Sequence, residues 1–372
     1  MKVLLVGNYE FDGSISMKVW ADALLRELLK RKIDVQLISP KPIIGRMKQS
    51  PGGWGKWLGY IDRFVIFPRK LRAAAAEADV VHMCDHGSAM YAFKVKDKPT
   101  VVTCHDLLAV RGALGEVPDC PASHFGGLLQ SWICRGLEHA TCVACVSQYT
   151  FNDARRILRR TDNLRVVLNG LNYQYQPLSE NEVDRRLAGV LESRDAVVLH
   201  VGSNLARKNR EGVMKIFAAV GKGTNLRLVF AGAPLSCELL ALAKELSIDN
   251  RISQVVRPRV ETLEALYNRA LVLLFPSRWE GFGWPPIEAQ ACGCPVVASD
   301  IPPLAEVLGQ SASLRPVGDE TGMADDVKRL MVDRPYREQL RRNGFENVDS
   351  RFQMTRMLNE YVSLYRDLTC QN

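Results

Sequence analysis

Short apolar runs alternate with longer amphipathic segments along the chain. The first run, residues 3–6, is followed by a loop and by residues 14–30, where one set of apolar side chains recurs at helical spacing: Ile15, Val19, Ala23, Leu24 and Leu28. A second apolar run at residues 35–39 predicts another strand. Because two strands joined through a helix pair in parallel, this stretch predicts a βαβ unit of a parallel α/β sheet.

The same alternation continues in two halves. The first half has further predicted strands at residues 80–83, 100–104, 140–146 and 166–172, the last with its turn, and the second half at residues 196–202, 226–232, 252–256 and 271–275. A polar stretch at residues 173–188 separates the halves, and residues 352–368 form an amphipathic helix. Because 372 residues exceed one ordinary core, we expect one domain at residues 1–175, a second at 176–351 and a closing helical segment at 352–372.

The stretch FPSRWEGFGWPPIEAQACGCPVVASDIPPLAEVLG, residues 275–309, combines a strand end, a loop and a helix. Pro285 and Pro286 are predicted to open the helix and Gly293 to close it. Glu280 lies in the loop, and Glu288 is expected in the first helical turn, where unpartnered amides favour anions. Such a turn keeps a carboxylate ionised and can also hold a phosphate or sugar oxygen.

Three residues follow Glu280 in this loop: Gly281, Phe282 and Gly283. The two glycines have no Cβ, so a ligand could lie directly against the backbone amides there. Two carboxylates are acceptors only, which suits a ligand rich in hydroxyl groups. A bare pair of Glu residues in a Gly- and Pro-rich loop is equally well explained as solvated surface charge.

The whole string resembles the E-x7-E signature of the retaining glycosyltransferases of family 4. That resemblance implies the GT-B fold: two Rossmann-like domains with parallel sheets facing across a cleft, and a C-terminal helix that crosses back to the N-terminal domain. It also implies transfer of a hexosyl unit from a nucleotide-diphosphate sugar, a UDP- or GDP-sugar, to a hydroxyl acceptor. Polysaccharide, glycolipid or other glycoconjugate synthesis would use such a reaction.

Arg207 and Lys208 lie between the strand at residues 196–202 and a predicted helix, where a helix dipole attracts phosphate. They resemble the diphosphate-binding Lys motif of the family. Ser203 stands where many members carry Arg directly after the Gly, so Arg207 is expected to supply that charge. The resemblance further implies that Glu280 contacts the donor sugar and that Glu288 accepts from the ribose hydroxyls.

His105 follows the strand at residues 100–104, at the strand end where open α/β sheets bind ligands. A lone His there is more often structural, but the resemblance implies one that reaches the donor sugar. The expected catalytic residues are therefore His105, Lys208 and Glu280. Gly13 and Ser14, in the loop after the first strand, are either a plain βα turn or, as in the family, a contact to donor phosphate or acceptor.

The sequence has no convincing Asp-x-Asp pair, so we expect fixed cations in place of a metal ion, and no cofactor beside the nucleotide-sugar substrate. Losing one donor that stabilises developing charge typically costs about 3 kcal/mol. Four cysteines draw attention by their spacing but are interpreted as small buried hydrophobes: Cys142, Cys145, Cys292 and Cys294.

The net charge of +8 suits an anionic partner, and no nucleic-acid motif or long basic block accompanies it. The acceptor stays open between a glycan, a lipid-linked glycan and a small molecule. Residues 54–72 intersperse aromatic side chains, Trp54 and Trp57 among them, with Lys and Arg. That pattern fits an ordinary packed helix or an interfacial helix in peripheral contact with an anionic membrane.

The opening MKVLLVGN has no signal-peptide pattern, and no apolar run approaches about 20 residues. We expect a cytoplasmic protein. Peripheral association with the inner face of the membrane stays an open alternative. Two other functions also stay open: a GT-B-type nucleotide-sugar 2-epimerase and a non-catalytic subunit that binds nucleotide sugar. For the transferase itself, a front-side mechanism and double displacement are not distinguished.

Overall fold

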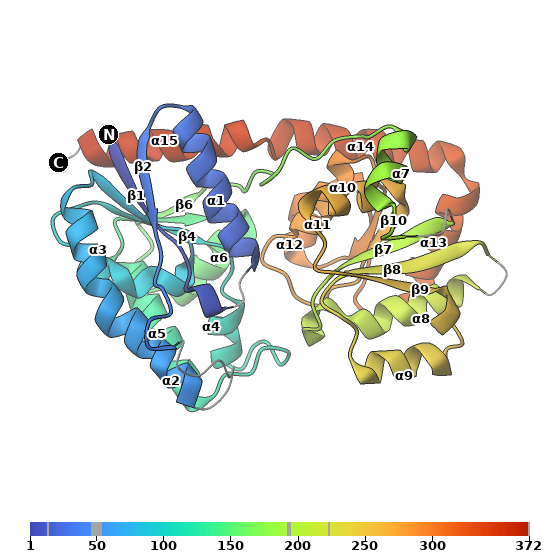
Figure 1. Ribbon diagram of the computed structural model, residues 1–372, viewed down its shortest axis with the longest axis horizontal. Helices are drawn as coiled ribbons and strands as arrows, with labels where there is room; N and C mark the ends of the chain where they lie inside the picture. Colours follow the sequence, from blue (N-terminus) through green and yellow to red (C-terminus); the bar gives the residue numbers. More distant parts are fainter. Residues whose placement is uncertain (13–14, 46–53, 192–194, 222–223, 371–372) are drawn as a thin grey trace. The chain divides into compact units, whose positions relative to one another are not determined.

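The chain forms two compact units in a computed structural model that describes residues 1–12, 15–45, 54–191, 195–221 and 224–370 (Figure 1). Unit 1 contains Met1–Asn172 together with Met354–Asn372, and unit 2 contains Tyr173–Gln353. The divisions therefore fall at residues 172/173 and 353/354, where the sequence predicts 175/176 and 351/352. Gly13 and Ser14 lie outside the described residues.

Unit 1 is built on a six-stranded parallel sheet of order β2-β1-β3-β4-β5-β6. The prediction of a parallel α/β sheet is confirmed, and the strands are short and rich in buried Val, Leu and Cys, as expected of strands covered on both faces. Their bounds are β1 (Lys2–Val6), β2 (Asp34–Ile38), β3 (Val80–Met83), β4 (Thr100–Cys104), β5 (Cys142–Cys145) and β6 (Leu164–Val166).

Helices cover both faces of this sheet. One face packs against α3, α5, α6 and a 3-10 helix in an apolar core that includes Val81, Val102 and Leu137. The bounds of the helical segments are Glu10–Asp12 (3-10), α1 (Ile15–Lys30), α2 (Trp54–Ile61), Asp62–Ile66 (π-helix), α3 (Phe67–Ala76), His86–Lys94 (3-10), α4 (Leu108–Ala113), α5 (His124–His139), α6 (Gln148–Ile157) and α15 (Met354–Cys370).

The opposite face of the unit 1 sheet carries a cluster of aromatic and polar side chains. On α1, Trp20 is fully buried while Val19 is 39% exposed, so the predicted apolar face was wrong at Val19. The helix is turned so that the large indole, and not the smaller Val side chain, fills the space against the sheet. Trp20 donates from Nε1 to Asn169 Oδ1 at 3.1 Å.

The closing helix α15 completes this polar face. Tyr365 Oη lies 2.6 Å from His82 Nδ1 on β3, and Tyr361 Oη lies 2.8 Å from Thr103 Oγ1 on β4. His82 Nε2 lies 2.7 Å from the same Thr103 hydroxyl. Burial lowers the pKa of His82 to about 3, so the ring is neutral and shares its two nitrogens between hydroxyl groups. These bonds make α15 part of unit 1, as the resemblance implied.

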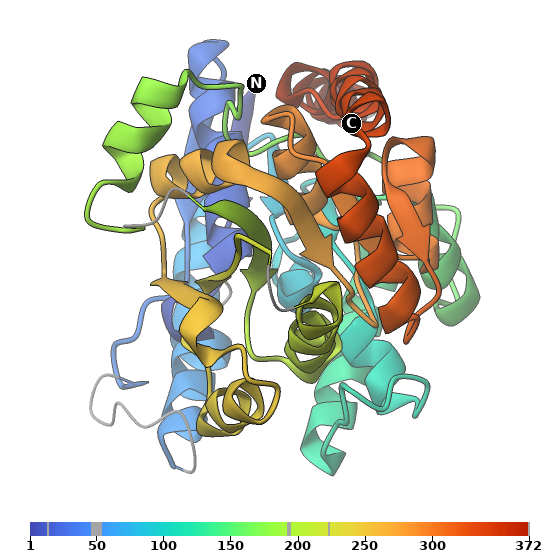
Figure 2. The same cartoon turned by 90° about the vertical axis from the view of Figure 1, so that its right-hand side faces the viewer.

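Unit 2 repeats the architecture with a second six-stranded parallel sheet, of order β12-β11-β10-β7-β8-β9. One face packs against α8, α9 and α13 (Figure 2). The core on this face includes Phe217, Phe230 and Val327. The strands are β7 (Ala196–Gly202), β8 (Leu226–Gly232), β9 (Ile252–Val256), β10 (Ala270–Phe275), β11 (Val296–Ser299) and β12 (Ser313–Arg315).

The helical segments of unit 2 are α7 (Glu180–Leu187), Ala206–Lys208 (3-10), α8 (Arg210–Val220), α9 (Cys237–Glu245), Asp249–Arg251 (3-10), α10 (Val260–Arg269), α11 (Trp284–Ala291), α12 (Pro302–Leu308), Gly309–Ser311 (3-10), α13 (Glu320–Val332) and α14 (Arg334–Arg351). In the described part of the chain, none of the helices combines the length and apolar character needed to cross a membrane.

Candidate functional site

Glu280 is the centre of a buried ion cluster in unit 2. Its Oε1 accepts from Lys208 Nζ at 2.6 Å and its Oε2 accepts from Arg207 Nη1 at 3.0 Å. The Glu280 side chain is only 6% exposed. Burial raises the pKa of Glu280, but Lys208 and Arg207 more than offset it, so the pKa lies below its usual value and the group is a carboxylate. Two predicted donor-site cations thus meet the first Glu of the E-x7-E motif.

Asn209 fixes the loop that carries these cations. It adopts φ 53°, in the left-handed region, and its side chain caps α8 by accepting from Gly212 N at 3.2 Å. Its Nδ2 also donates to the Pro276 carbonyl at 3.1 Å, which ties the loop after β7 to the loop after β10. The Lys208 ammonium lies 4.9 Å from the centre of the Phe275 ring, a cation–π contact. Lys208 is therefore held opposite Glu280 by the fold.

Helix α11 ends at Gly293 as the sequence predicts, but it begins at Trp284, one residue before the first proline. The two prolines occupy its first turn, and Gly293 ends it with φ 74°. Gly293 N donates to Gln290 O at 2.9 Å and Cys294 N donates to Ala289 O at 2.9 Å, which is a Schellman motif. At the start, Gly283 has φ 105°, and a Cβ there would lie 2.6 Å from Leu304 Cδ2. Packing and backbone conformation therefore require this glycine.

The neighbours of Gly283 lie in a buried loop. Gly281 is buried directly after Glu280. The ring of Phe282 is also buried and contacts Trp284 and Phe352, at centroid distances of 6.1 and 5.7 Å. Its side chain thus belongs to the core of unit 2, which leaves the backbone amide as the group that a ligand would meet.

The expected position of Glu288 in the first helical turn was wrong. Helix α11 starts at Trp284, so Glu288 is its fifth residue, beyond the unpartnered amides of the first turn. Its Oε2 accepts from Tyr267 Oη at 2.8 Å, and the side chain is 6% exposed. Burial raises the pKa of Glu288 to about 7, although Tyr267 and Tyr175 lower it. The environment thus opposes ionisation of this carboxyl.

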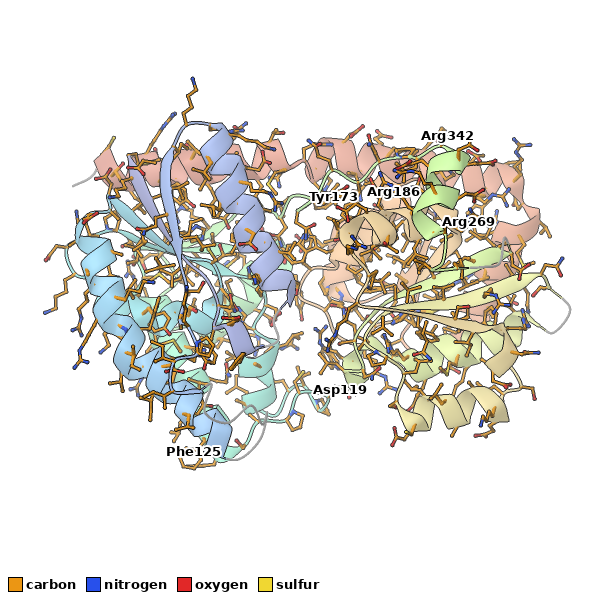
Figure 3. The ribbon with its side chains drawn as sticks, in the orientation of Figure 1. Asp119, Phe125, Tyr173, Arg186, Arg269 and Arg342 are labelled. Atoms are coloured by element: carbon orange, nitrogen blue, oxygen red, sulfur yellow. The ribbon has the colours of Figure 1, made fainter. Side chains whose placement is uncertain are left out.

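Glu264 on α10 is a buried polar residue that sequence reasoning missed. It is 1% exposed and pairs with Arg186 Nη1 at 2.5 Å. Its Oε1 accepts from Gln176 N at 3.0 Å, so it also holds the start of unit 2. Figure 3 shows Tyr173 and Arg186 beside each other in this region. Nothing in the local sequence marks Glu264, because its partners are distant in the chain.

His105 lies at the carboxyl end of β4 in unit 1 and is buried. Its Nε2 donates to the Cys84 carbonyl at 3.0 Å, and its ring meets Trp20 edge-on at 5.1 Å. Burial lowers the pKa of His105, although Asp85 raises it, so the neutral imidazole is favoured. A neutral ring with Nε2 protonated can accept a hydrogen bond at Nδ1.

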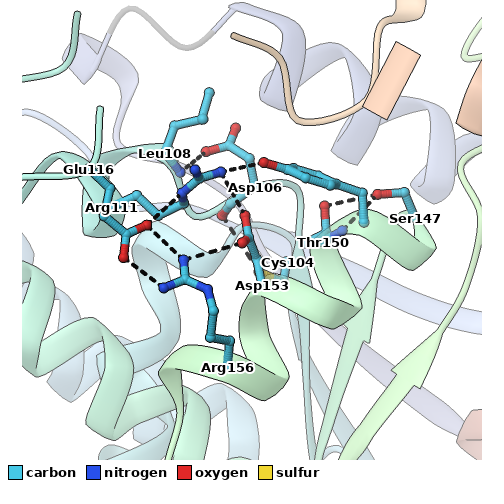
Figure 4. A network of polar contacts seen from close by, with 10 residues as sticks. Cys104, Asp106, Leu108, Arg111, Glu116, Ser147, Thr150, Asp153 and Arg156 are labelled. Carbon is cyan, nitrogen blue, oxygen red and sulfur yellow. Dashed lines mark hydrogen bonds and ion pairs between the residues drawn. The ribbon is translucent and has the colours of Figure 1, made fainter. Parts of the chain in front are cut away.

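The loop after His105 is held by a second polar network (Figure 4). Asp106 Oδ1 accepts from Leu108 N at 3.0 Å and so turns the chain into α4. Arg111 on α4 pairs with Glu116 at 3.0 Å and with Asp153 on α6 at 3.1 Å, and it also donates to Tyr149. Arg111 therefore joins α4 to α6.

Within the described ranges, no group of three or more His, Cys, Asp or Glu side chains is placed to hold a metal ion. The four cysteines noted for their spacing are buried and free. Burial raises the pKa of Cys142 and Cys294 to about 12. Such thiols stay protonated and behave as small apolar groups.

Two family models match the chain. Glycosyl transferases group 1 matches residues 185–347, which lie in unit 2, and Glycosyltransferase Family 4 matches residues 17–175, which lie in unit 1 except for the last three. The chain belongs to the group 1 glycosyltransferases of family 4, which confirms the resemblance noted in the E-x7-E stretch.

Individual relatives and structures agree with this family. N-acetyl-alpha-D-glucosaminyl L-malate synthase of Bacillus anthracis is 24% identical over 236 residues, covering 63% of this chain and 61% of the relative. The sucrose-phosphate synthase structure from Thermosynechococcus elongatus has a TM-score of 0.80 at 20% identity and full coverage of both chains. Anabaena HepE in complex with UDP and glucose has a TM-score of 0.76 at 17% identity, with 99% of this chain and 100% of that chain covered.

These structures show the fold, which is the two-domain GT-B α/β fold. The aligned regions span 61%, 52% and 54% of the lengths of three curated relatives, so the chain matches little more than half of them.

Proposed function

We propose that the protein is a retaining glycosyltransferase that moves a hexosyl unit from a nucleoside-diphosphate sugar, a UDP- or GDP-sugar, to a hydroxyl acceptor. The observation that carries this proposal is the buried cluster in which Lys208 and Arg207 meet Glu280. A ligand that brings a diphosphate to this place would meet two fixed cations. The Anabaena neighbour with UDP and glucose bound supports a nucleotide sugar as the donor.

In this reaction the bond from the anomeric carbon to the diphosphate oxygen breaks, and a bond from that carbon to the acceptor oxygen forms. The acceptor proton passes to the departing diphosphate in the front-side form of the mechanism. Negative charge grows on the diphosphate as the bond breaks, and Lys208 and Arg207 are placed to stabilise it. We propose that these cations take the role that a divalent metal ion has in other transferases.

The two Glu residues have separate tasks in this proposal. Glu280 is ionised and orients both cations, and it would contact the donor sugar where positive charge develops. Glu288 would accept from the ribose hydroxyls. We propose that His105 in unit 1 contacts the donor sugar, as the family resemblance implies. Its Nδ1 would accept a hydrogen bond there.

A donor panel tests the proposal. UDP-, GDP-, ADP- and dTDP-sugars would be compared by thermal shift and by slow donor hydrolysis, in the wild type and in Lys208→Ala. Lys215→Ala is the matched control, because Lys215 is exposed on α8. Stabilisation and turnover with one donor, lost in Lys208→Ala and kept in the control, are expected. Equal binding of every donor by Lys208→Ala and wild type would contradict the proposal.

The non-catalytic alternative makes a different prediction in the same panel. A subunit that only binds nucleotide sugar would be stabilised by one donor without turnover in any acceptor mixture. A 2-epimerase would convert the donor without an acceptor, and membership of the group 1 glycosyltransferases argues against it.

We also propose that unit 1 contacts an anionic membrane at the cytoplasmic face, through an apolar ridge on α5 and the π-helix. Phe125 is 66% exposed at the start of α5 and points outward in Figure 3, and Leu128 and Val65 are also exposed. The two elements adjoin, because Phe64 and Trp132 pack at 5.1 Å. The side chains of Trp54 and Trp57 lie outside the described residues.

Charge supports an anionic lipid surface as the partner of this ridge. The adjoining helix α3 exposes three basic side chains and has no acidic residue: Arg69, Lys70 and Arg72. Vesicle flotation with and without phosphatidylglycerol tests the contact. Phe125→Ser with Leu128→Ser should reduce binding, whereas Val332→Ser, at an exposed apolar position in unit 2, should not. Absence of wild-type binding to anionic vesicles would end this part of the proposal.

A further inference from the structure

The carboxyl group of Glu288 is held by a phenol from another helix. Tyr267 comes from α10 and is fully buried, and its hydroxyl donates to Glu288 Oε2 at 2.8 Å. Tyr175 also hydrogen-bonds the same carboxyl. Its ring packs edge-on against Tyr267, with ring centroids 5.8 Å apart. The carboxyl therefore lies among aromatic side chains and is hydrogen-bonded by two phenols, Tyr267 and Tyr175.

Tyr175 belongs to the connector, residues 173–178, which opens unit 2. The connector is bonded to α10 along its length: Gln176 N donates to Glu264 Oε1 at 3.0 Å, and Leu178 N donates to Asn268 Oδ1 at 2.7 Å. Asn268 Nδ2 returns a bond to Gln176 O at 3.0 Å. The backbone directly after Tyr175 is thus fixed to the helix that carries Tyr267.

Ion pairs also join α7 to α10. Arg186 pairs with Glu264 at 2.5 Å, and Arg269 on α10 pairs with Asp184 on α7. Figure 3 shows Tyr173, Arg186 and Arg269 gathered where the connector, α7 and α10 adjoin. Tyr173 stacks edge-on against Tyr175 at 5.1 Å, so a row of three phenol rings runs from the connector to Glu288.

This arrangement of phenols around Glu288 suits recognition of a ribose. Two vicinal hydroxyls donate best to a carboxylate whose oxygens are fixed and ionised. Burial works against ionisation of Glu288, and a protonated carboxyl would present a donor to one of the hydroxyls instead. A phenol that donates to Oε2 favours the ionised form and fixes the plane of the group.

We propose that Tyr267, packed in place by the connector residue Tyr175, is the positioning residue that presents the Glu288 carboxylate to the ribose hydroxyls of the donor. The inference rests on the proposed function, because it takes Glu288 as the ribose acceptor. The groups that face this carboxyl are Tyr267 from α10, Tyr175 from the connector and Cys292 at the end of α11, and Glu264 from α10 acts on Tyr175 and Cys292. Of these, Tyr267 makes the bond of 2.8 Å to Glu288 Oε2.

The test separates ribose recognition from general support of the fold. Dissociation constants are measured by calorimetry for UDP and GDP and for their 2′,3′-dideoxy forms. Wild type should prefer the ribose form, and Tyr267→Phe should reduce that preference by about tenfold while the dideoxy affinity stays unchanged. Tyr175→Phe should reduce it less. Tyr336→Phe is the matched control, because Tyr336 on α14 contacts Arg329 away from Glu288.

The pH dependence gives a second readout that a purely structural role would not move. Loss of the phenol raises the pKa of Glu288 further, so the ribose preference of Tyr267→Phe should disappear at a higher pH than in the wild type. An unchanged pH midpoint would overturn the inference. Binding of inorganic pyrophosphate, unchanged in Tyr267→Phe, shows that the variant is folded.

Glu288→Gln distinguishes failure of the inference from failure of the proposed function. If Glu288→Gln loses the ribose preference and Tyr267→Phe keeps it, the positioning role is wrong and the donor site stands. If Glu288→Gln keeps the preference of the wild type, Glu288 does not read the ribose, and the proposed function of this residue fails together with the inference. Loss of preference in both variants supports the inference.

Discussion

Glu288→Gln should stabilise the protein at alkaline pH. The native carboxyl has a pKa of about 7 against 4.5 for an ordinary Glu side chain, because burial opposes its charge. This difference corresponds to about 3 kcal/mol, since one pKa step is worth about 1.4 kcal/mol. The side chain is 6% exposed, so solvent screening reduces that figure little. Glutamine has the same shape and carries no charge to desolvate.

The sign follows from the two pKa values. Below about pH 4 the carboxyl is protonated in the folded and unfolded chains, and its burial carries no ionic cost. As the pH rises toward 7, the unfolded chain loses the proton first, so the free energy of unfolding of the wild type falls. Above about pH 7.5 the full cost of about 3 kcal/mol is present. The Glu288→Gln variant has no such cost, because its side chain is uncharged at every pH.

Urea unfolding at about pH 5 and about pH 8, followed by circular dichroism, measures the effect on the transition of unit 2. The variant should gain most of its advantage at the higher pH. Glu261→Gln is the matched control, because Glu261 lies exposed on α10. An advantage of Glu288→Gln that is the same at both pH values, or that is larger at the lower one, would refute the reasoning.

Three further changes test other parts of the structure. Lys208→Ala leaves the buried Glu280 with Arg207 alone and should lower turnover about a hundredfold in a donor-hydrolysis assay; a rate within about twofold of wild type would contradict the role of the ion cluster. Gly232→Ala would place Cβ 2.2 Å from the Gly202 carbonyl oxygen and should cost about 3 kcal/mol in urea unfolding, whereas Gly189→Ala, which meets open space, should cost about 1 kcal/mol. Tyr361→Phe removes one buried hydrogen bond to Thr103 and should lower the free energy of unfolding by about 1 kcal/mol; no change would mean that the bond is not formed.

Much of the fold could be predicted because its signals are local. Short apolar runs marked most of the strands of both sheets, and Pro285, Pro286 and Gly293 marked both ends of α11. The error at Val19 arose because periodicity gives the apolar stripe of a helix but not which bulky neighbour the sheet selects. The error at Glu288 arose from a boundary: the helix begins one residue before the first proline, which moves the Glu beyond the first turn.

The candidate site was predictable only where a motif carried it. Lys208 and Glu280 are 72 residues apart, and only the family resemblance indicated that they meet. Tyr267, Tyr175 and Glu264 were missed, because each looks like an ordinary residue of a helix or a loop. Their function depends on which side chains the tertiary fold brings to them. Phe125 was missed for a similar reason, since its helix α5 packs against a π-helix that precedes it by about 60 residues.

The polar face of the unit 1 sheet has a consequence for synthesis of the chain. Tyr361 and Tyr365 complete that face, yet they are made after the whole of unit 2. At about 5–20 residues per second, a ribosome needs roughly 10–40 s to make the intervening chain. During that time His82 and Thr103 lack their phenol partners. Unit 2 can therefore finish folding first, and unit 1 reaches its native state only when α15 leaves the ribosome.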